Sequence, residues 1–142
     1  MNIDTCLKEG YLTRIKPNQN DLIKKEINEA EYDLEKAKES FKEEDFKWSI
    51  IKAYYVIFHI SKALLFKLGY KEKRHFAIGV VLEELNKEGK LEIEYINYFK
   101  AAISSREDAD YHYIYSKDNA EYIIENAEEF IERILKLIKT LK

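Results

Sequence analysis

The 142-residue chain has the size of one domain, and its 46% hydrophobic residues, 36% charged residues, 4 glycines and 1 proline exclude a disordered tail and favour long helices. Its formal net charge of -3 excludes a broad basic surface for nucleic acid, so we expect no binding to DNA and only a local site for RNA. The single cysteine, Cys6, excludes an internal disulfide framework and fits a reducing, cytoplasmic environment.

No stretch of the sequence is predicted to cross a membrane. The most apolar stretch, residues 53–60, is bounded by Lys52 and Lys62 and is far shorter than the roughly 20 residues that a spanning helix needs. The first residues contain no apolar signal core, so we expect a cytoplasmic protein. Abundant Lys, Glu and Ile beside a single glutamine, Gln19, resemble the composition of thermophile proteins.

The N-terminal part of the chain is predicted to lead into a long helix. Residues 1–19 contain the only proline, Pro17, and we expect a short helical turn followed by an irregular lead-in. From Asn20 to about Glu44, apolar residues recur at steps of three and four with charged residues between them. This pattern predicts an amphipathic helix capped by Asn20 or Asp21.

Two more helices are predicted in the middle of the chain. The first begins at a cap formed by Asp45 and ends at Gly69, a residue suited to a left-handed helix end. It is apolar on most sides, so we expect it in the middle of a bundle. A second helix is predicted over residues 73–86, with Gly89 as its stop and Gly79 as a point of close helix packing.

The last two predicted helices flank the most polar part of the chain. Leu91 begins a long helix, and residues 104–113 near its end read Ser-Ser-Arg-Glu-Asp-Ala-Asp-Tyr-His-Tyr. The C-terminal helix is predicted to begin at a cap formed by Ser116 or Asp118, and Asp118 with Glu121 resembles a capping box.

No strand period and no internal repeat are visible. The sequence therefore predicts an all-α protein, an up-and-down bundle of about five helices. We expect a single domain over residues 1–142, with a lead-in at 1–19 and the bundle at 20–142.

Arg106 and His112 are the residues from which we expect chemistry. Arg106 continues the inward face of its helix, where an unpaired guanidinium group would be costly. Arginine can hold two phosphate oxygens and stabilise charge in a transition state, and histidine can move a proton near neutral pH. The alternative is that Asp110, four residues after Arg106, simply neutralises the guanidinium group.

The spacing of these two residues predicts a dimer. Six residues at about 100° each place His112 roughly 120° around a straight helix from Arg106. One helix face therefore cannot hold both side chains. They can converge if the helix ends or kinks near Asp110, or if a two-fold homodimer brings two such segments together.

Other polar residues have simpler interpretations. His59 lies among apolar helix residues and is interpreted as a hydrogen-bonded core residue. His75 begins a helix beside Lys73 and Arg74. Such a basic cluster could bind a phosphate at the helix N-terminus, but most clusters of this kind are solvated surface. The three histidines are not spaced like zinc ligands, so we expect neither a metal nor a cofactor. Helical tyrosines usually fill cores, but three near the chemistry could stack on bases: Tyr111, Tyr113 and Tyr115.

Four segments, in order and spacing, resemble HEPN (higher eukaryotes and prokaryotes nucleotide-binding) domains of the prokaryotic toxin-like branch. They cover residues from about 20 to 140: Lys52-Ala-Tyr-Tyr-Val-Ile-Phe-His59 with Lys62-Ala-Leu-Leu65 and Gly69; Lys73-Arg-His75 with the stripe that follows it; Arg106-Glu-Asp-Ala-Asp-Tyr111; and Ala120 through Ala127 to Phe130.

The resemblance implies a helical homodimer with a cleft formed by two copies of an Arg-x4-6-His motif, which Arg106 and His112 would supply, supported by Asp110 and Tyr111. Many members resemble metal-independent ribonucleases that act as toxins beside a minimal nucleotidyltransferase antitoxin. In some, a tyrosine two residues after the histidine is adenylylated. That position is Ile114 here, so Tyr113 and Tyr115 become the candidates.

Glu107 also departs from the family pattern, since Asn, Asp or His often follows the motif arginine, and Asp108 and Asp110 add negative charge where RNA phosphate would approach. Three hypotheses therefore remain: a HEPN endoribonuclease toxin, a catalytically silent module that binds a nucleotidyltransferase or a nucleotide, and a purely structural helical dimer. An adjacent nucleotidyltransferase gene would favour the first two.

Overall fold

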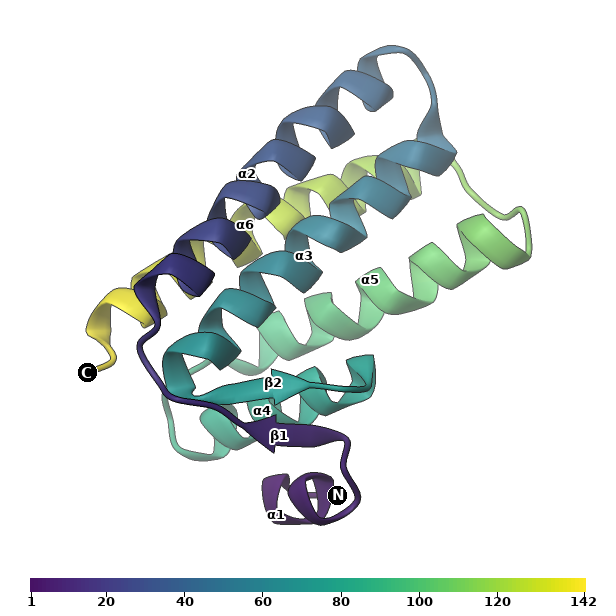
Figure 1. Ribbon diagram of the computed structural model, residues 1–142. Coiled ribbons are helices and arrows are strands. Elements are labelled where there is room, and N and C mark those ends of the chain that lie inside the picture. The colour runs from purple at the N-terminus through teal and green to yellow at the C-terminus, as the bar shows by residue number, and fades with distance from the viewer.

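A computed structural model describes residues 1–142 and shows a bundle of four long helices with a smaller layer at one end (Figure 1). The elements in chain order are α1 (Ile3–Lys8), β1 (Leu12–Arg14), α2 (Asn20–Lys42), α3 (Phe46–Leu68), β2 (Tyr70–Glu72), α4 (His75–Lys87), α5 (Ile93–Tyr111) and α6 (Lys117–Thr140). Sequential long helices run in opposite directions, which confirms the predicted all-α, up-and-down architecture.

The central position of α3 follows from its composition. It packs against α2, α5 and α6, and 14 of its residues are buried, so a helix that is apolar nearly all round is covered by neighbours on several sides. By length and composition α3 could also cross a membrane, contrary to the expectation from the shorter apolar stretch. However, 78% of its apolar window is buried inside the protein, which accounts for the composition.

Helix ends agree with the sequence where one side chain decides them. The Asp45 carboxylate accepts a hydrogen bond from the backbone N–H of Trp48 and begins α3, and Gly69 ends it with a left-handed φ of 93°. Ser116 caps α6 in the same way through the N–H of Asn119.

Two predicted caps were wrong. Neither Asn20 nor Asp21 caps α2, because both lie inside the helix and Gln19 occupies the cap position without a side-chain bond. Asp118 likewise lies in the first turn of α6, so it forms no capping box with Glu121.

A small sheet, which the sequence did not predict, joins the lead-in to the bundle. β1 and β2 pair antiparallel with Thr13 opposite Lys71, and three-residue strands are too short to show a period of two. Gly69 permits the approach of the lead-in, since a Cβ atom there would lie 3.0 Å from the Ile15 carbonyl oxygen. At Gly79, a Cβ atom would lie 3.3 Å from the Phe99 ring, so this glycine does allow α4 to pack closely on α5.

Candidate functional site

Arg106 lies on α5 where that helix faces α3. The inward residues Phe99 and Ala102 are buried, and the same face continues through Ser105 and Ala109, which are also buried. Arg106 is half-buried, with 23% of its side chain exposed. The packing of α5 therefore holds the base of the arginine in the bundle and leaves part of the guanidinium group accessible.

The guanidinium group of Arg106 lies between aromatic rings and one carboxylate. Its central carbon is 5.6 Å from the Tyr54 ring centroid and 5.4 Å from that of Tyr111, and Nη2 is 3.4 Å from Oδ2 of Asp110. Nε is buried without a hydrogen-bond partner. Burial acts to lower the pKa of Arg106, but the nearby tyrosines and Asp110 outweigh it and raise the pKa, so the group stays charged.

His112 is the C-cap residue of α5, and it is exposed. Its backbone N–H donates to the carbonyl oxygen of Asp108, 3.1 Å away. The helix continues through Tyr111, and no hydrogen bond or ion pair joins His112 to Arg106. The structure therefore shows no direct interaction between the two candidate catalytic residues within one chain.

Large apolar and aromatic side chains gather on the surface around His112. Tyr113 has a left-handed backbone with φ of 56°, which a bulky residue rarely adopts, and the N–H of Ile114 donates to the Asp108 carbonyl oxygen at 2.9 Å. The Lys47 ammonium at the start of α3 lies 5.8 Å from the Tyr113 ring and 5.9 Å from the Trp48 ring, so α3 borders this region. We call these exposed residues the aromatic end surface: Trp48, Tyr111, Tyr113, Ile114 and Tyr115.

Sequence reasoning missed Tyr54 as a site residue and left His75 as surface. The Tyr54 hydroxyl lies 2.6 Å from Nδ1 of His75, and Tyr54 also contacts Arg106. The only sequence signal was a tyrosine within the most apolar helix, where a buried hydroxyl group needs a polar partner.

His59 is half-buried and hydrogen-bonded, which agrees with its interpretation as a structural residue. Its Nδ1 lies 3.1 Å from Glu26 and its Nε2 lies 3.7 Å from Asp33, while Lys62 also pairs with Glu26 at 3.2 Å. Glu29, Asp33 and His59 offer three potential metal ligands that lie within 4.8 Å of one another. Histidine spacing alone could not reveal this group, because its carboxylates come from α2 and its histidine from α3.

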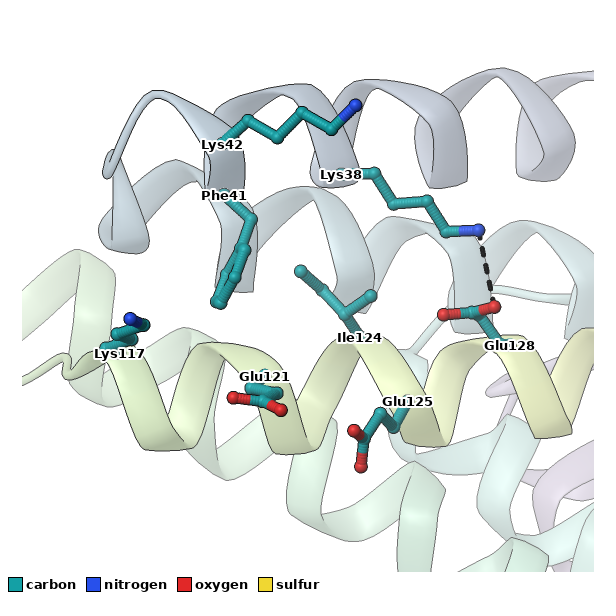
Figure 2. Close-up of a pocket in the computed structure, with 8 residues that line it drawn as sticks. All are labelled: Lys38, Phe41, Lys42, Lys117, Glu121, Ile124, Glu125 and Glu128. Atoms are coloured by element: carbon teal, nitrogen blue, oxygen red, sulfur yellow. Dashed lines mark ion pairs between the residues drawn. The ribbon is translucent and has the colours of Figure 1, made fainter.

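The two largest grooves lie between α2 and α6 and contain none of these residues. Figure 2 shows one of them, with a volume of about 510 Å³, where Phe41 and Ile124 lie among charged side chains and Lys38 pairs with Glu128. Its alternating charges are typical of a solvated helix junction. We therefore place the candidate site around Tyr54 of α3, which contacts His75 of α4 and Arg106 of α5.

Known proteins match this chain over most of its length. A family model described as HEPN domain matches residues 23–138. "Putative toxin MJ0605" of Methanocaldococcus jannaschii is 34% identical over 133 residues, which cover 84% of this chain and 97% of the relative. "Putative toxin MJ0142" of the same organism is 27% identical over 119 residues, which cover 82% of this chain and 81% of the relative. A "UPF0332 protein" of Archaeoglobus fulgidus is 31% identical over 116 residues, which cover 80% of this chain and 92% of the relative. The family match and these identities confirm the resemblance seen in the sequence: the chain belongs to the HEPN domain family.

Proposed function

We propose that this protein is a metal-independent HEPN endoribonuclease, the toxin of a cytoplasmic pair with a minimal nucleotidyltransferase antitoxin. The observation that carries the proposal is the Arg106 guanidinium group, held half-buried by aromatic rings with Nε unpaired and its outer edge accessible. The names of the two Methanocaldococcus relatives support a toxin.

In the proposed reaction, Arg106 binds non-bridging oxygens of an RNA phosphodiester and stabilises the extra negative charge of the pentavalent transition state. His112 takes the proton of the ribose 2′-hydroxyl group, and the 2′-oxygen attacks phosphorus. The bond between phosphorus and the 5′-oxygen breaks, and a water molecule or the protonated histidine of a second subunit gives that oxygen a proton. The products are a 2′,3′-cyclic phosphate and a 5′-hydroxyl end.

A homodimer is part of this proposal because no hydrogen bond joins Arg106 to His112 within one chain and their positions differ by roughly 120° around the helix. The aromatic end surface next to His112 exposes large apolar side chains, as surfaces that pack against a partner do. A two-fold axis near this surface would place the His112 of one subunit close to the Arg106 of the other.

The test is cleavage of structured and single-stranded RNA by the purified protein in the presence of a metal chelator. Arg106→Ala and His112→Ala should each lower the rate by about 100-fold or more, because each removes one catalytic role. Arg133→Ala is the matched control, since Arg133 is similarly half-buried but pairs with Glu92 elsewhere on the surface. Circular dichroism checks that each variant folds. Absence of cleavage by the wild type, or normal cleavage by both site variants, would exclude the ribonuclease.

The second candidate function is a catalytically silent HEPN module that binds a nucleotidyltransferase or a nucleotide. The ion pair between Arg106 and Asp110 favours it, because the carboxylate places a negative charge 3.4 Å from Nη2, where a phosphate would have to approach. Stable binding to a minimal nucleotidyltransferase, without cleavage of any RNA, would support this function instead.

A further inference from the structure

The hydroxyl group of Tyr54 decides which nitrogen of His75 carries a proton. Tyr54 is only 2% exposed, and its hydroxyl has a single hydrogen-bond partner, Nδ1 of His75 at 2.6 Å. Burial raises the pKa of Tyr54 to about 12, so the hydroxyl keeps its proton. A buried O–H group with one partner donates to it. Nδ1 therefore accepts, and the proton of the neutral imidazole lies on Nε2.

The Nε2–H group of His75 is left without a protein partner. His75 is an exposed residue at the start of α4, and its only side-chain hydrogen bond is the one through Nδ1. The Phe58 ring, with its centroid 4.5 Å from that of His75, packs against the imidazole. The hydrogen bond on one edge and the aromatic contact fix the ring, so the donor on the other edge has a defined orientation.

Two cationic side chains, Arg106 and Lys62, lie near the His75 ring, together with the Glu72 carboxylate. Arg106 and His75 contact the same Tyr54 ring, with its centroid 5.6 Å from the guanidinium carbon and 6.2 Å from the imidazole centroid. The Lys62 ammonium lies 5.4 Å from the Phe58 ring that packs on His75. The first turn of α4, which begins at His75, has no side-chain cap, so its N–H groups add positive potential at this helix end.

The charge balance around His75 favours a neutral ring. Partial desolvation of the ring where it packs on Tyr54 and Phe58 lowers the pKa of His75, the Glu72 carboxylate acts to raise it, and Arg106 and Lys62 lower it further. The net direction is downward, so near neutral pH the imidazole is a hydrogen-bond donor rather than a second cation. A neutral donor beside a permanent cation is suited to holding a phosphodiester without repelling Arg106.

We propose that His75 and Arg106 form one phosphodiester-binding site of RNA, in which the Nε2–H group of His75 donates to a non-bridging phosphate oxygen. Tyr54 is the positioning residue between them. This inference rests on the proposed function for the identity of the ligand as RNA, and it adds a substrate-binding residue from α4 to the motif on α5.

Two substitutions of His75 separate substrate binding from a merely structural role. His75→Asn keeps an acceptor near the position of Nδ1 for the Tyr54 hydroxyl but removes the donor at Nε2. His75→Gln places an amide N–H group near the position of Nε2. If the only role of His75 is to accept the hydrogen bond of the Tyr54 hydroxyl, His75→Asn should lower RNA affinity less than His75→Gln does.

The probe is a fluorescein-labelled, 2′-O-methylated RNA oligonucleotide, which the proposed reaction cannot cleave, titrated with the full-length protein and followed by anisotropy. His75→Asn should weaken binding by about 10-fold, the effect of losing a hydrogen bond to a charged group. His75→Gln should stay within about threefold of the wild type. Equal affinity of all three proteins would overturn the site. Equal loss in both variants would overturn the assignment of Nε2–H as the contact.

Nitrogen NMR of the wild-type imidazole provides a measurement that does not depend on folding of the variants. It should show His75 protonated at Nε2 and unprotonated at Nδ1 near neutral pH, and the Nε2 signal should shift when the oligonucleotide binds. A proton on Nδ1, or an Nε2 signal that the oligonucleotide leaves unchanged, would overturn the proposal.

Cleavage assays on the same proteins separate this inference from the proposed function. Binding that depends on His75 in a protein that never cleaves RNA would support the site and exclude the ribonuclease. Cleavage that neither His75 variant changes, with unchanged affinity, would support the ribonuclease and exclude His75 from the site.

Discussion

Arg106 and Asp110 lie one turn apart on α5, with 3.4 Å between Nη2 and Oδ2. This separation is longer than the 2.7–2.9 Å typical of a charge-assisted hydrogen bond, and both side chains are partly exposed. The carboxylate therefore compensates the guanidinium charge without occupying its donors in a short bidentate contact. An RNA phosphate would compete with Asp110 for the same group.

Asp110→Asn should consequently strengthen RNA binding. It removes the competing charge next to Arg106, and because the ion pair is partly exposed we expect an increase of about two- to fivefold in affinity. Titration of the 2′-O-methylated oligonucleotide measures this change.

Glu107→Gln is the matched control for that experiment. It makes the same change in net charge one residue from Arg106, but Glu107 is exposed and forms no ion pair. An increase of the same size in both variants would show a general charge effect. A large loss of affinity in Asp110→Asn would instead make Asp110 a residue that positions Arg106.

Local features of the fold could be predicted from the sequence, because one or two residues decide them. The cap at Asp45 and the left-handed end at Gly69 depend on neighbouring backbone groups only. The pairing of Arg106 with Asp110 was also foreseen as an alternative, since residues four apart on a helix are neighbours.

The remaining features depend on tertiary packing. Tyr54 and His75 are 21 residues apart, and only the docking of α4 beside α3 brings the hydroxyl group to the imidazole. The strands β1 and β2 were missed because each contains three residues and pairs with a segment far away in the chain. The sequence indicates at most that a buried Tyr54 hydroxyl needs a polar partner, and it does not indicate which residue supplies that partner.

Ile114→Glu should convert the proposed dimer to a monomer without unfolding it. Ile114 is 63% exposed within the aromatic end surface, so a charge there costs little in the monomer but would be buried in the proposed interface. Light scattering at tens of micromolar measures the mass. Leu22→Glu is the control, because Leu22 is also exposed and lies in the first turn of α2, at the opposite end of the bundle (Figure 1). A wild-type monomer would contradict the shared site.

If a nucleotidyltransferase controls this protein as proposed, incubation with ATP and that enzyme should add AMP to Tyr113 or Tyr115. Both hydroxyl-bearing rings are exposed beside His112, and a bulky, charged adduct there would obstruct RNA and the second subunit. Peptide mass spectrometry locates the adduct, with Tyr113→Phe and Tyr115→Phe as the variants. Tyr32 is the internal control, since it is exposed on α2 away from this surface. Modification of Tyr32 alone, or of no tyrosine, would contradict this mode of control.

Glu26→Gln should lower the free energy of unfolding at neutral pH by about 1–3 kcal/mol, because the buried carboxylate loses its charge-assisted contacts with His59 and Lys62. Burial acts to raise the pKa of Glu26, but the His59 hydrogen bond and the Lys62 charge outweigh it and hold the pKa below its ordinary value of 4.5.

A carboxyl group with a lowered pKa in the folded state stabilises the protein above the unfolded-state pKa, and this contribution disappears as the pH falls through the folded-state pKa. The difference between wild type and Glu26→Gln should therefore be present at neutral pH and shrink below about pH 4.5, as Glu26 becomes protonated. Urea unfolding at a series of pH values measures it, and Glu31→Gln, an exposed residue on α2 outside the His59 cluster, should show no such difference. A gap that persists or widens in acid would contradict the role of the Glu26 charge.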